Sequence, residues 1–477
     1  MTVGSVNGDV LDLVFGSDSR GMDLASRAAS SNVQFVRSQV QLAPASEHAR
    51  GRRLTATEAL STFGWQALVT AATEGSFPFI TDPREPAATL KTRRAALGLN
   101  EAQVARAAGV DPTIVSEAET PGRRSAVRDL EQIAQALALD ERVLGYVPNA
   151  KGDRHLGVRL RELTSDKAVN RFTASVVMGL SEAAWVVARQ NSLSAALGEA
   201  PDALVSGEAQ RDWNYAYPSW EQGLRLAGKT RALLGLGDRP IASVRRLMED
   251  QLGIPLVQLS LDGRFAGATL ANEGTRGVVI NERGANGNVR VRRMTLCHEL
   301  GHLLWDPEQC LDRLTVDDYE GIERDYKDAK PDRVEIRANA FAVAFLAPPD
   351  EVRRLTNQAA AADDAVRAVM ESFGISFSAA RHHIRNLTGV VTNHVRPWDA
   401  PFDPWTTAEN LTIDFFPIRT TPISRRGRFA NRVVQAHARG LVSSDTASMM
   451  LRCPTGQFER HLAALRDITM PVTPAGA

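Results

Sequence analysis

Residues 297–305 read C-H-E-L-G-H-L-L-W, so the motif H-E-x-x-H lies inside an apolar, helix-forming run. His298 and His302 are four residues apart and therefore share one face of a helix. Two imidazoles in this arrangement can bind one Zn²⁺ ion, and Glu299 then lies near the ion without having to ligate it. A general base that activates water belongs at that position. The stretch predicts a zinc-binding helix; the alternative is a helix with two surface histidines.

A catalytic zinc ion needs a third protein ligand and one open coordination position. Residues 333–347 form a second strongly helical stretch, which Pro348 ends. On this helix Glu335 and Asn339 are four residues apart and share a face. Glu335 can therefore be the third ligand, and Asn339 can orient a ligand histidine. The alternative is a solvated carboxylate at Glu335. Three other carboxylates are rivals for the ligand role: Asp306, Glu320 and Glu323.

The composition indicates several folded domains rather than a disordered chain. The 477 residues are 43% hydrophobic and 6% aromatic, and a chain of this length forms about two to four domains. Lys plus Arg and Asp plus Glu are both 56, so the formal net charge is zero. This balance argues against a whole-chain electrostatic grip on nucleic acid or membrane, although it is compatible with a local patch.

Cysteine usage and the apolar runs predict the compartment. The chain has three cysteines, an odd number and too few for a disulfide framework. Its first residues lack a basic region followed by an apolar core, and no run approaches the roughly 20 apolar residues of a membrane span. The expected location is a reducing cytoplasm, and no membrane partner is expected.

Residues 83–150 show the short helices and short loops of a helix-turn-helix domain. Gly109 lies where a tight turn would join two helices, and Asp111 can cap the second of them. Together with Leu99, Val104 and Val115, this pattern resembles the repressor-type (XRE-like) DNA-binding domain. Residues available for DNA contacts there are Arg93, Arg94, Thr113, Ser116, Arg123 and Arg124.

Two departures from that resemblance leave the role of residues 83–150 open. Glu101 stands where the family usually has a polar amide, and Glu117 stands where it often has a basic residue. Carboxylates that face a phosphate backbone are repelled by it. The domain is therefore expected either to bind DNA or to serve as a scaffold for dimerisation or peptide docking.

The remaining segments are expected to be a region of unknown role (1–82), a helical connector (151–238), a zincin-like domain (239–392) and a helical C-terminal domain after a linker (393–477). The overall fold class is α+β and mostly α. In residues 239–392, three short strands are expected as a small β-meander that precedes the H-E-x-x-H helix. Four arginines in the C-terminal segment form a local basic run, interpreted as a solvated face or a nucleic-acid contact: Arg425, Arg426, Arg428 and Arg432.

The two helices with their preceding strands resemble the ImmA/IrrE family of metallopeptidases over about residues 239–392. The resemblance rests on Thr295, the motif from His298 to His302, and the pattern Glu335-x-x-Ala338-Asn339-x-Phe341. It implies zinc as cofactor, with His298, His302 and Glu335 as ligands and Glu299 as the base. Ala347 departs from the family pattern, which commonly has a larger residue before Pro348.

The resemblance also implies a function. Family members cut a transcriptional repressor to release genes for stress response or mobile-element transfer, so the expected activity is zinc-dependent limited proteolysis of a regulatory protein. One alternative is a DNA-binding regulator whose peptidase-like domain acts as a sensor. Another is a toxin or defence component with a restrained peptidase. Expected partners are the protein substrate, DNA through residues 83–150, and further copies of the chain. Four residues are candidates for stabilising the oxyanion: Tyr319, Tyr326, His382 and His383.

Overall fold

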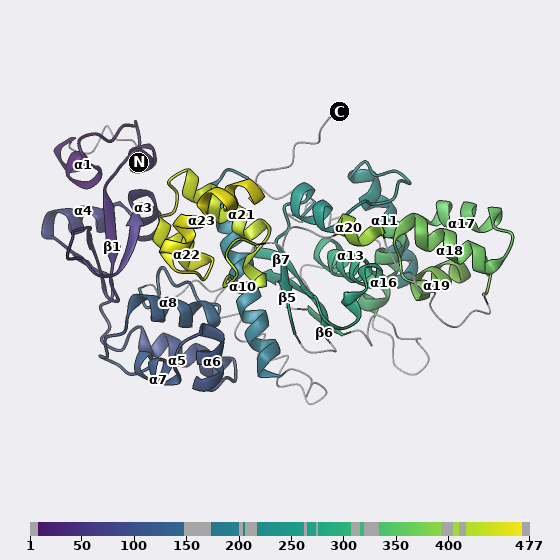
Figure 1. The fold of residues 1–477 in the computed structure, drawn as a ribbon, viewed down its shortest axis with the longest axis horizontal. Helices are drawn as coiled ribbons and strands as arrows, with labels where there is room; N and C mark the ends of the chain where they lie inside the picture. Colours follow the sequence, from purple (N-terminus) through teal and green to yellow (C-terminus); the bar gives the residue numbers. More distant parts are fainter. Residues whose placement is uncertain are drawn as a thin grey trace. The chain divides into compact units, whose positions relative to one another are not determined.

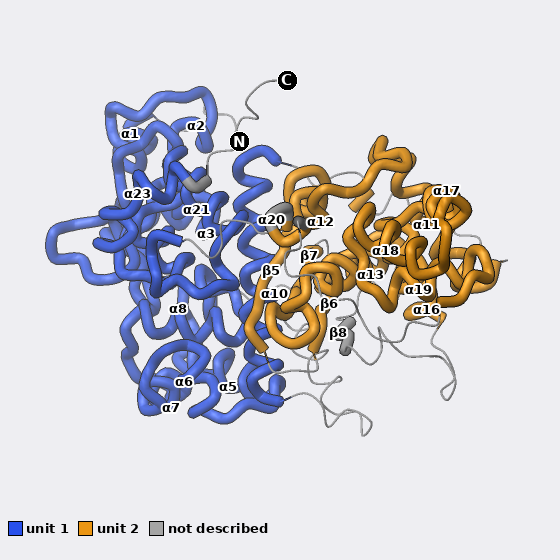
Figure 2. Tube along the Cα trace, turned by 45° about the vertical axis from the view of Figure 1, so that its right-hand side comes forward, with its two compact units in different colours: residues 1–199, 412–477 blue, residues 200–411 orange. Residues whose placement is uncertain are grey.

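The computed structural model describes ten stretches of the chain, and it divides the chain into two compact units (Figure 2). Unit 1 comprises residues 1–199 and 412–477, and unit 2 comprises residues 200–411. The described stretches are 8–146, 173–199, 204–205, 217–261, 265–272, 275–306, 315–318, 333–392, 404–409 and 416–469. Unit 2 is thus one continuous segment, whereas unit 1 is built from two separate parts of the sequence.

The N-terminal part of unit 1 is a small α/β domain (Figure 1). Its antiparallel sheet has the strand order β3-β1-β2-β4, and its core includes Phe15, Phe35 and Leu68. The elements are α1 (Gly8–Phe15), α2 (Leu24–Ala29), β1 (Gln34–Arg37), β2 (Gln41–Pro44), β3 (Arg52–Thr55), α3 (Ala56–Phe63), α4 (Trp65–Glu74) and β4 (Phe77–Pro78). Gly64 at φ +82° separates α3 from α4.

Four short helices follow in unit 1: α5 (Ala87–Ala96), α6 (Glu101–Ala108), α7 (Pro112–Ala118) and α8 (Val127–Ala136). Gly109 ends α6 in the left-handed conformation at φ +73°. The Asp111 carboxylate accepts a hydrogen bond from the Thr113 N–H and so caps α7. The turn and the cap expected from the sequence are both confirmed.

The rest of unit 1 is helical, and its basic run is partly interior. Its elements are α10 (Ala174–Ala196), η5 (Ile423–Arg425), α21 (Arg428–Ala438), α22 (Ser444–Met450) and α23 (Thr455–Thr469). Arg425 is fully buried, and its Nε atom lies 2.6 Å from a carboxylate oxygen of Glu182 on α10. Arg432 is also buried and pairs with Glu199. The interpretation of these two arginines as a solvated face or nucleic-acid contact is therefore wrong.

Unit 2 contains a four-stranded sheet in the order β5-β7-β6-β8. Its strands are β5 (Leu256–Leu259), β6 (Phe265–Asn272), β7 (Thr275–Asn281) and β8 (Thr315–Asp318). β6 and β7 form a hairpin, but β5 pairs in parallel with β7 rather than with β6. The expected β-meander is therefore wrong at β5, because this strand does not pair with the strand that follows it in the sequence. All four residues of β5 are buried, as suits a parallel strand covered on both faces.

Two long helices pack together beside this sheet and carry the motifs found in the sequence (Figure 1). They are α13 (Val289–Trp305) and α16 (Arg333–Leu346), and both also contribute to the apolar core of unit 2. Gly301 permits their close approach, because a Cβ atom there would lie 2.8 Å from Cδ1 of Phe341. α11 (Ser219–Leu233) also packs against α16, and its Thr230 accepts a 3.0 Å hydrogen bond from Trp305 of α13. The two helices thereby fix the motif residues with respect to one another.

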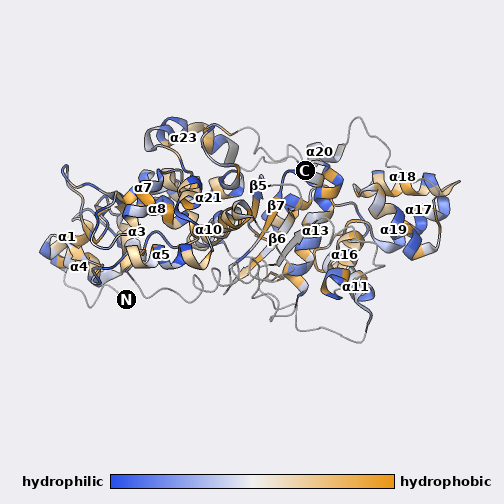
Figure 3. Ribbon diagram, turned by 90° about the horizontal axis from the view of Figure 1, so that it is seen from below, coloured by the Kyte–Doolittle hydropathy of each residue, from blue (hydrophilic) through white to orange (hydrophobic). Residues whose placement is uncertain are grey.

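Shorter elements complete unit 2. They are α12 (Val244–Arg246), the π-helix η3 (Leu247–Gln251), the 3-10 helix η4 (Gly284–Gly287), α17 (Pro349–Gln358), α18 (Ala362–Phe373), α19 (Phe377–Thr388) and α20 (Pro404–Glu409). α17 is largely hydrophilic, as its colours in Figure 3 show. The π-helix η3 directly continues α12.

In the described stretches, no helix combines the length and the apolar character that a membrane crossing requires.

Candidate metal centre

Helix α13 brings the two motif histidines together in the interior of unit 2. His298 and His302 are both buried, and their Nε2 atoms lie 2.9 Å apart. The two side chains share a face because they are one helical turn apart. Two ring nitrogens that face each other this closely form half of a metal-binding set.

Helix α16 adds the carboxylate of Glu335 to this pair. Its Oε2 lies 3.3 Å from His298 Nε2, and its Oε1 lies 3.5 Å from His302 Nε2. Donor atoms about 2.0–2.2 Å from a tetrahedral Zn²⁺ are about 3.3–3.5 Å from one another. The two distances from Glu335 match this spacing, while the 2.9 Å between the two histidine nitrogens is shorter, so a small separation of the two rings would complete the fit to zinc. The Glu335 side chain is 24% exposed, so solvent reaches the set from its side.

The electrostatics of Glu335 favour an ionised carboxylate. Burial would raise the pKa of Glu335, but when His298 and His302 are protonated and no metal is bound, their hydrogen bonds and positive charge outweigh that effect. The pKa of Glu335 is therefore well below its ordinary value. A carboxylate that stays ionised near neutral pH is suited to bind a cation.

Each histidine ring is oriented through its other nitrogen. His298 Nδ1 lies 2.9 Å from Asn339 Oδ1, and His302 Nδ1 lies 3.0 Å from Asp306 Oδ2. An amide oxygen and a carboxylate accept hydrogen bonds, so both Nδ1 atoms carry the proton and both Nε2 atoms keep a lone pair. Asp306 in turn pairs with the buried Arg337 of α16. The rings are thus held in the tautomer that a metal requires.

Replacing Asn339 by alanine is expected to weaken zinc binding about 10- to 100-fold, because His298 loses the acceptor that fixes its tautomer. The measurement is the zinc dissociation constant by competition with a chromophoric chelator. Asn357→Ala on the exposed surface of α17 is the matched control and should leave the constant unchanged. Equal affinities for the two variants would show that Asn339 does not support the site.

Glu299 is placed by helix α13 and by strand β6. It is buried, and the Thr269 hydroxyl donates a 2.8 Å hydrogen bond to its Oε2. Gly267 leaves room for the carboxylate, because a Cβ atom there would overlap Oε1 of Glu299. The strand therefore holds the Glu299 carboxylate in one position beside the two histidines.

Sequence reasoning missed the supporting roles of Asp306, Arg337, Thr269 and Gly267. Asp306 carried a usable signal, because it follows His302 by four residues and is in reach on the same helical face. The sequence alone gives it only the role of a rival ligand. The other three depend on contacts between separate elements, which the local sequence does not show.

Several other candidates do not join the described site. Glu320, Glu323, Tyr319 and Tyr326 lie outside the described residues. His382 and His383 both belong to α19. His383 is buried, and its Nε2 lies 3.0 Å from the carbonyl oxygen of Ala347, just after α16. Its hydrogen bond thus serves the packing of α19 near the end of α16.

His383 is expected to make unit 2 less stable in acid. Burial lowers its pKa from 6.5 to about 4, so below pH 6.5 the unfolded chain binds a proton that the folded chain does not. Stability therefore falls as the pH falls, by about 2 kcal/mol between pH 7.5 and pH 5. The measurement is the free energy of local unfolding of α19 by amide exchange at both pH values.

His383→Gln keeps a donor for the Ala347 carbonyl but does not titrate, so part of the acid sensitivity should disappear in this variant. His48→Gln, an exposed position in unit 1, is the control. An unchanged pH dependence in His383→Gln would contradict this assignment.

The six residues considered for DNA contact differ in how exposed their side chains are and in whether they already have an ion-pair partner. Arg93 is buried, and Arg94 forms two 2.6 Å hydrogen bonds with the buried Glu119, so neither guanidinium group is presented to a phosphate. Arg123 is exposed but lies 3.2 Å from Glu117. Thr113, Ser116 and Arg124 are exposed. DNA contact by these three residues stays a prediction.

Comparison with known families agrees with the geometry of unit 2. Residues 249–385 match the family model of the IrrE N-terminal-like domain, a peptidase family. The matched segment contains α13 and α16, and it supports a metallopeptidase-like function in the ImmA/IrrE family. No curated protein matches the chain.

Proposed function

We propose that the chain is a zinc-dependent endopeptidase that cuts a regulatory protein at a limited number of sites. A transcriptional repressor is the class of substrate proposed, in stress response, mobile-element control or defence. The observation that carries the proposal is the convergence of His298 Nε2, His302 Nε2 and a Glu335 oxygen within 4.8 Å of one another. Glu299 directly follows the first of these residues and has a fixed orientation.

The proposed roles of the residues follow from their contacts. His298, His302 and Glu335 would hold the metal, while Asn339 and Asp306 keep the two rings aligned. A Zn²⁺ ion held there supplies a Lewis acid that polarises the substrate carbonyl and makes water more acidic. Glu299 accepts a proton from the attacking water and delivers it to the leaving amine. The hydrogen bond from the Thr269 hydroxyl holds the Glu299 carboxylate in one orientation during both proton transfers.

The alternative of a DNA-binding regulator has weaker support. Glu117 lies 3.2 Å from Arg123, and Glu101 lies 3.8 Å from Arg94, so carboxylates neutralise two of the arginines considered for phosphates. A pure sensor or binding scaffold also has no need of a buried, oriented glutamate beside two histidines. A gel shift with genomic fragments at stated salt concentration tests this alternative.

The experiment that tests the proposal uses Glu299→Gln as a trap. The purified chain and this variant should each contain about one zinc ion per molecule by elemental analysis. Tagged Glu299→Gln, produced in cells of the source organism, should retain an uncut partner. Adding the unsubstituted chain should cut that partner, and a zinc chelator should stop the reaction.

Glu371→Gln, an exposed position on α18, is the matched control and should cut its partner normally. Two results would overturn the proposal. One is a chain without stoichiometric zinc whose activity does not respond to added zinc. The other is a captured partner that stays intact in the presence of the zinc-loaded, unsubstituted chain.

A further inference from the structure

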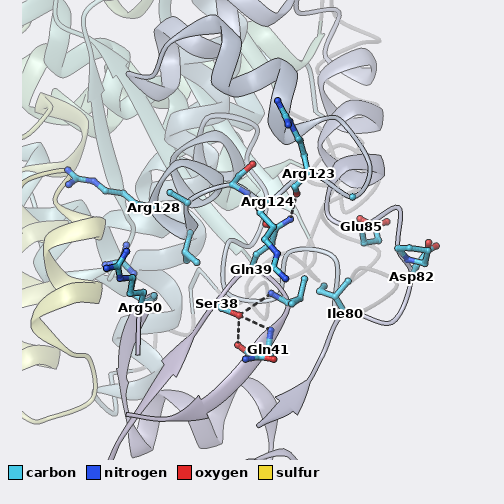
Figure 4. Close-up of a pocket in the computed structure, with 18 of the residues that line it drawn as sticks. Ser38, Gln39, Gln41, Arg50, Ile80, Asp82, Glu85, Arg123, Arg124 and Arg128 are labelled. Carbon is cyan, nitrogen blue, oxygen red and sulfur yellow. Dashed lines mark hydrogen bonds between the residues drawn. The ribbon is translucent and has the colours of Figure 1, made fainter. Parts of the chain in front are cut away.

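Unit 1 contains a cavity of about 1070 Å³ (Figure 4). Residues from four parts of unit 1 line it: the segment around β1 and β2, residues 80–85 before α5, residues 122–128 before and at the start of α8, and two residues near α22 and α23. Pockets that bind small ligands typically enclose about 300–1,000 Å³. The cavity is therefore large enough for a ligand of nucleotide size.

One side chain ties two walls of this cavity together. Gln39, in the turn between β1 and β2, accepts a 2.9 Å hydrogen bond from the Ser125 N–H through Oε1. Its Nε2 donates a 3.1 Å hydrogen bond to the carbonyl oxygen of Arg123. These bonds hold the segment before α8 against the N-terminal domain. The arginines of that segment are thereby kept at the cavity.

Three arginines of the cavity wall are available to a ligand. Arg50, Arg124 and Arg128 are exposed, and none of them has an ion-pair or hydrogen-bond partner for its guanidinium group within the described stretches. Two other lining arginines are already paired, Arg52 with Glu131 and Arg123 with Glu117. Guanidinium groups bind phosphate through parallel hydrogen bonds, so three free ones at one cavity indicate a phosphorylated ligand.

The start of α8 adds backbone donors on the same wall. This ten-residue helix begins at Val127, and its N-cap residue Ala126 makes no side-chain cap. The N–H groups of Ala126, Val127 and Arg128 find no acceptor in the part of the chain that the structure describes. Unpaired N–H groups at a helix N-terminus attract anions.

A second, independent sign of an anion comes from a small neighbouring cavity of about 50 Å³. It shares Arg52, Arg128 and Thr455 with the large cavity, and Arg452 also lines it. The Nε and Nη2 atoms of Arg452 are buried and have no hydrogen-bond partner among the described residues. Buried donors without an acceptor are rare in proteins, and an anion or a water in this cavity would supply one beside the Glu182 carboxylate, which interacts electrostatically with Arg452.

Two carboxylates lie at the opposite end of the large cavity, and that of Asp82 is paired with the guanidinium group of Arg84. Figure 4 shows Asp82 and Glu85 on the far side from Arg50 and Arg128, with Gln39 and Arg124 between them. The carboxylate of Glu85 accepts one hydrogen bond, from the Thr89 N–H to Oε2, so its Oε1 is left to accept one from an amino group of a base. The cavity therefore fits a small ligand with phosphates at one end and a hydrogen-bond donor at the other.

We propose that this cavity binds a small phosphorylated ligand of nucleotide size, with its phosphates on Arg50, Arg124, Arg128 and the start of α8. This site lies entirely in unit 1 and uses none of the residues assigned to metal binding or proteolysis. It would make unit 1 a sensor for a soluble nucleotide-like molecule.

The test is titration calorimetry of the full chain at 150 mM NaCl with four probes: inorganic triphosphate, ATP, GTP and a 16-base-pair DNA duplex. At least one nucleoside triphosphate should bind with one site per chain. Arg124→Gln and Arg128→Gln should each raise its Kd about tenfold or more, because each removes a charge-assisted contact. Arg106→Gln, an exposed arginine of α6 away from the cavity, is the matched control and should stay within about twofold.

The outcomes separate the proposal from its rivals. Inorganic triphosphate that competes with the nucleotide would place recognition in the phosphates and support the site. Binding of the duplex alone, with no competition by any nucleotide, would overturn the proposal in favour of nucleic acid. Absence of binding by all three small probes would also overturn it, as would nucleotide binding that neither cavity variant weakens. Unchanged melting curves of the variants would exclude misfolding as the cause of a lost signal.

Discussion

Glu299→Gln is expected to lower the rate of substrate cleavage about 10²- to 10⁴-fold while the chain keeps its zinc. The amide has the size of the carboxylate and can still accept the hydrogen bond from Thr269, but it cannot take a proton from water. His298, His302 and Glu335 are unchanged, so metal binding should persist. The measurement is kcat/KM with the partner that the variant itself captures, alongside the zinc content.

Thr269→Val provides a graded companion to this variant. It removes the hydroxyl that orients Glu299 but leaves the base in place, so its loss of activity should be smaller than that of Glu299→Gln. A Glu299→Gln protein that cuts at the normal rate with zinc bound would show that another group is the base. If Glu299→Gln loses its zinc, the activity of Thr269→Val decides. Normal activity of Thr269→Val would then count against Glu299 as the base.

Glu409→Ala is expected to destabilise unit 2 by about 3–5 kcal/mol, because it leaves the charge of Arg293 buried and unpaired. Glu409 is the last residue of α20, and its buried carboxylate pairs with the fully buried Arg293 of α13. The same carboxylate accepts hydrogen bonds from the N–H groups of Val244 at 2.9 Å and Arg245 at 3.3 Å. One side chain thus joins α20, α12 and the helix of the metal site.

The measurement is amide exchange of α13, whose opening free energy should fall by that amount. Glu371→Ala is the control for removing a glutamate, because Glu371 is exposed on α18. The double replacement Glu409→Leu with Arg293→Met should recover much of the loss, because no charge is then left without its partner. A Glu409→Ala protein as stable as Glu371→Ala would contradict the role given to the pair.

Local patterns in the sequence predicted much of the candidate site. The spacing of four residues between His298 and His302, and again between Glu335 and Asn339, is enough to place each pair on one helix face. The structure then brings the two helices together through Gly301 and Phe341. That packing was expected from the need for a third zinc ligand and from the resemblance to a family, because spacing within one helix does not say which other helix lies against it.

What the sequence could not show depends on contacts between distant residues. The partners Glu409 and Arg293 are 116 residues apart, and the region of Glu409 was expected to be a linker. Arg425 stands in a run of arginines typical of a surface, yet it pairs with Glu182, 243 residues away. A charged residue has the same appearance in the sequence whether water or a buried counter-ion surrounds it. The parallel pairing of β5 with β7 could not be predicted either, because the sequence pattern of a strand does not determine which strand lies beside it.

The division of the chain into units has a consequence for the order in which a ribosome can complete them. Unit 2 is contiguous, so all of its residues have been synthesised once residue 411 is made. Unit 1 must wait for its second part: the Ser443 N–H donates a hydrogen bond to Glu58, and Arg52 donates one to the Asp445 carbonyl. During synthesis the N-terminal part of unit 1 therefore leaves the ribosome first, but it forms these contacts only after the C-terminal part has been made. For that interval unit 2, which contains the candidate metal centre, is complete while unit 1 is not.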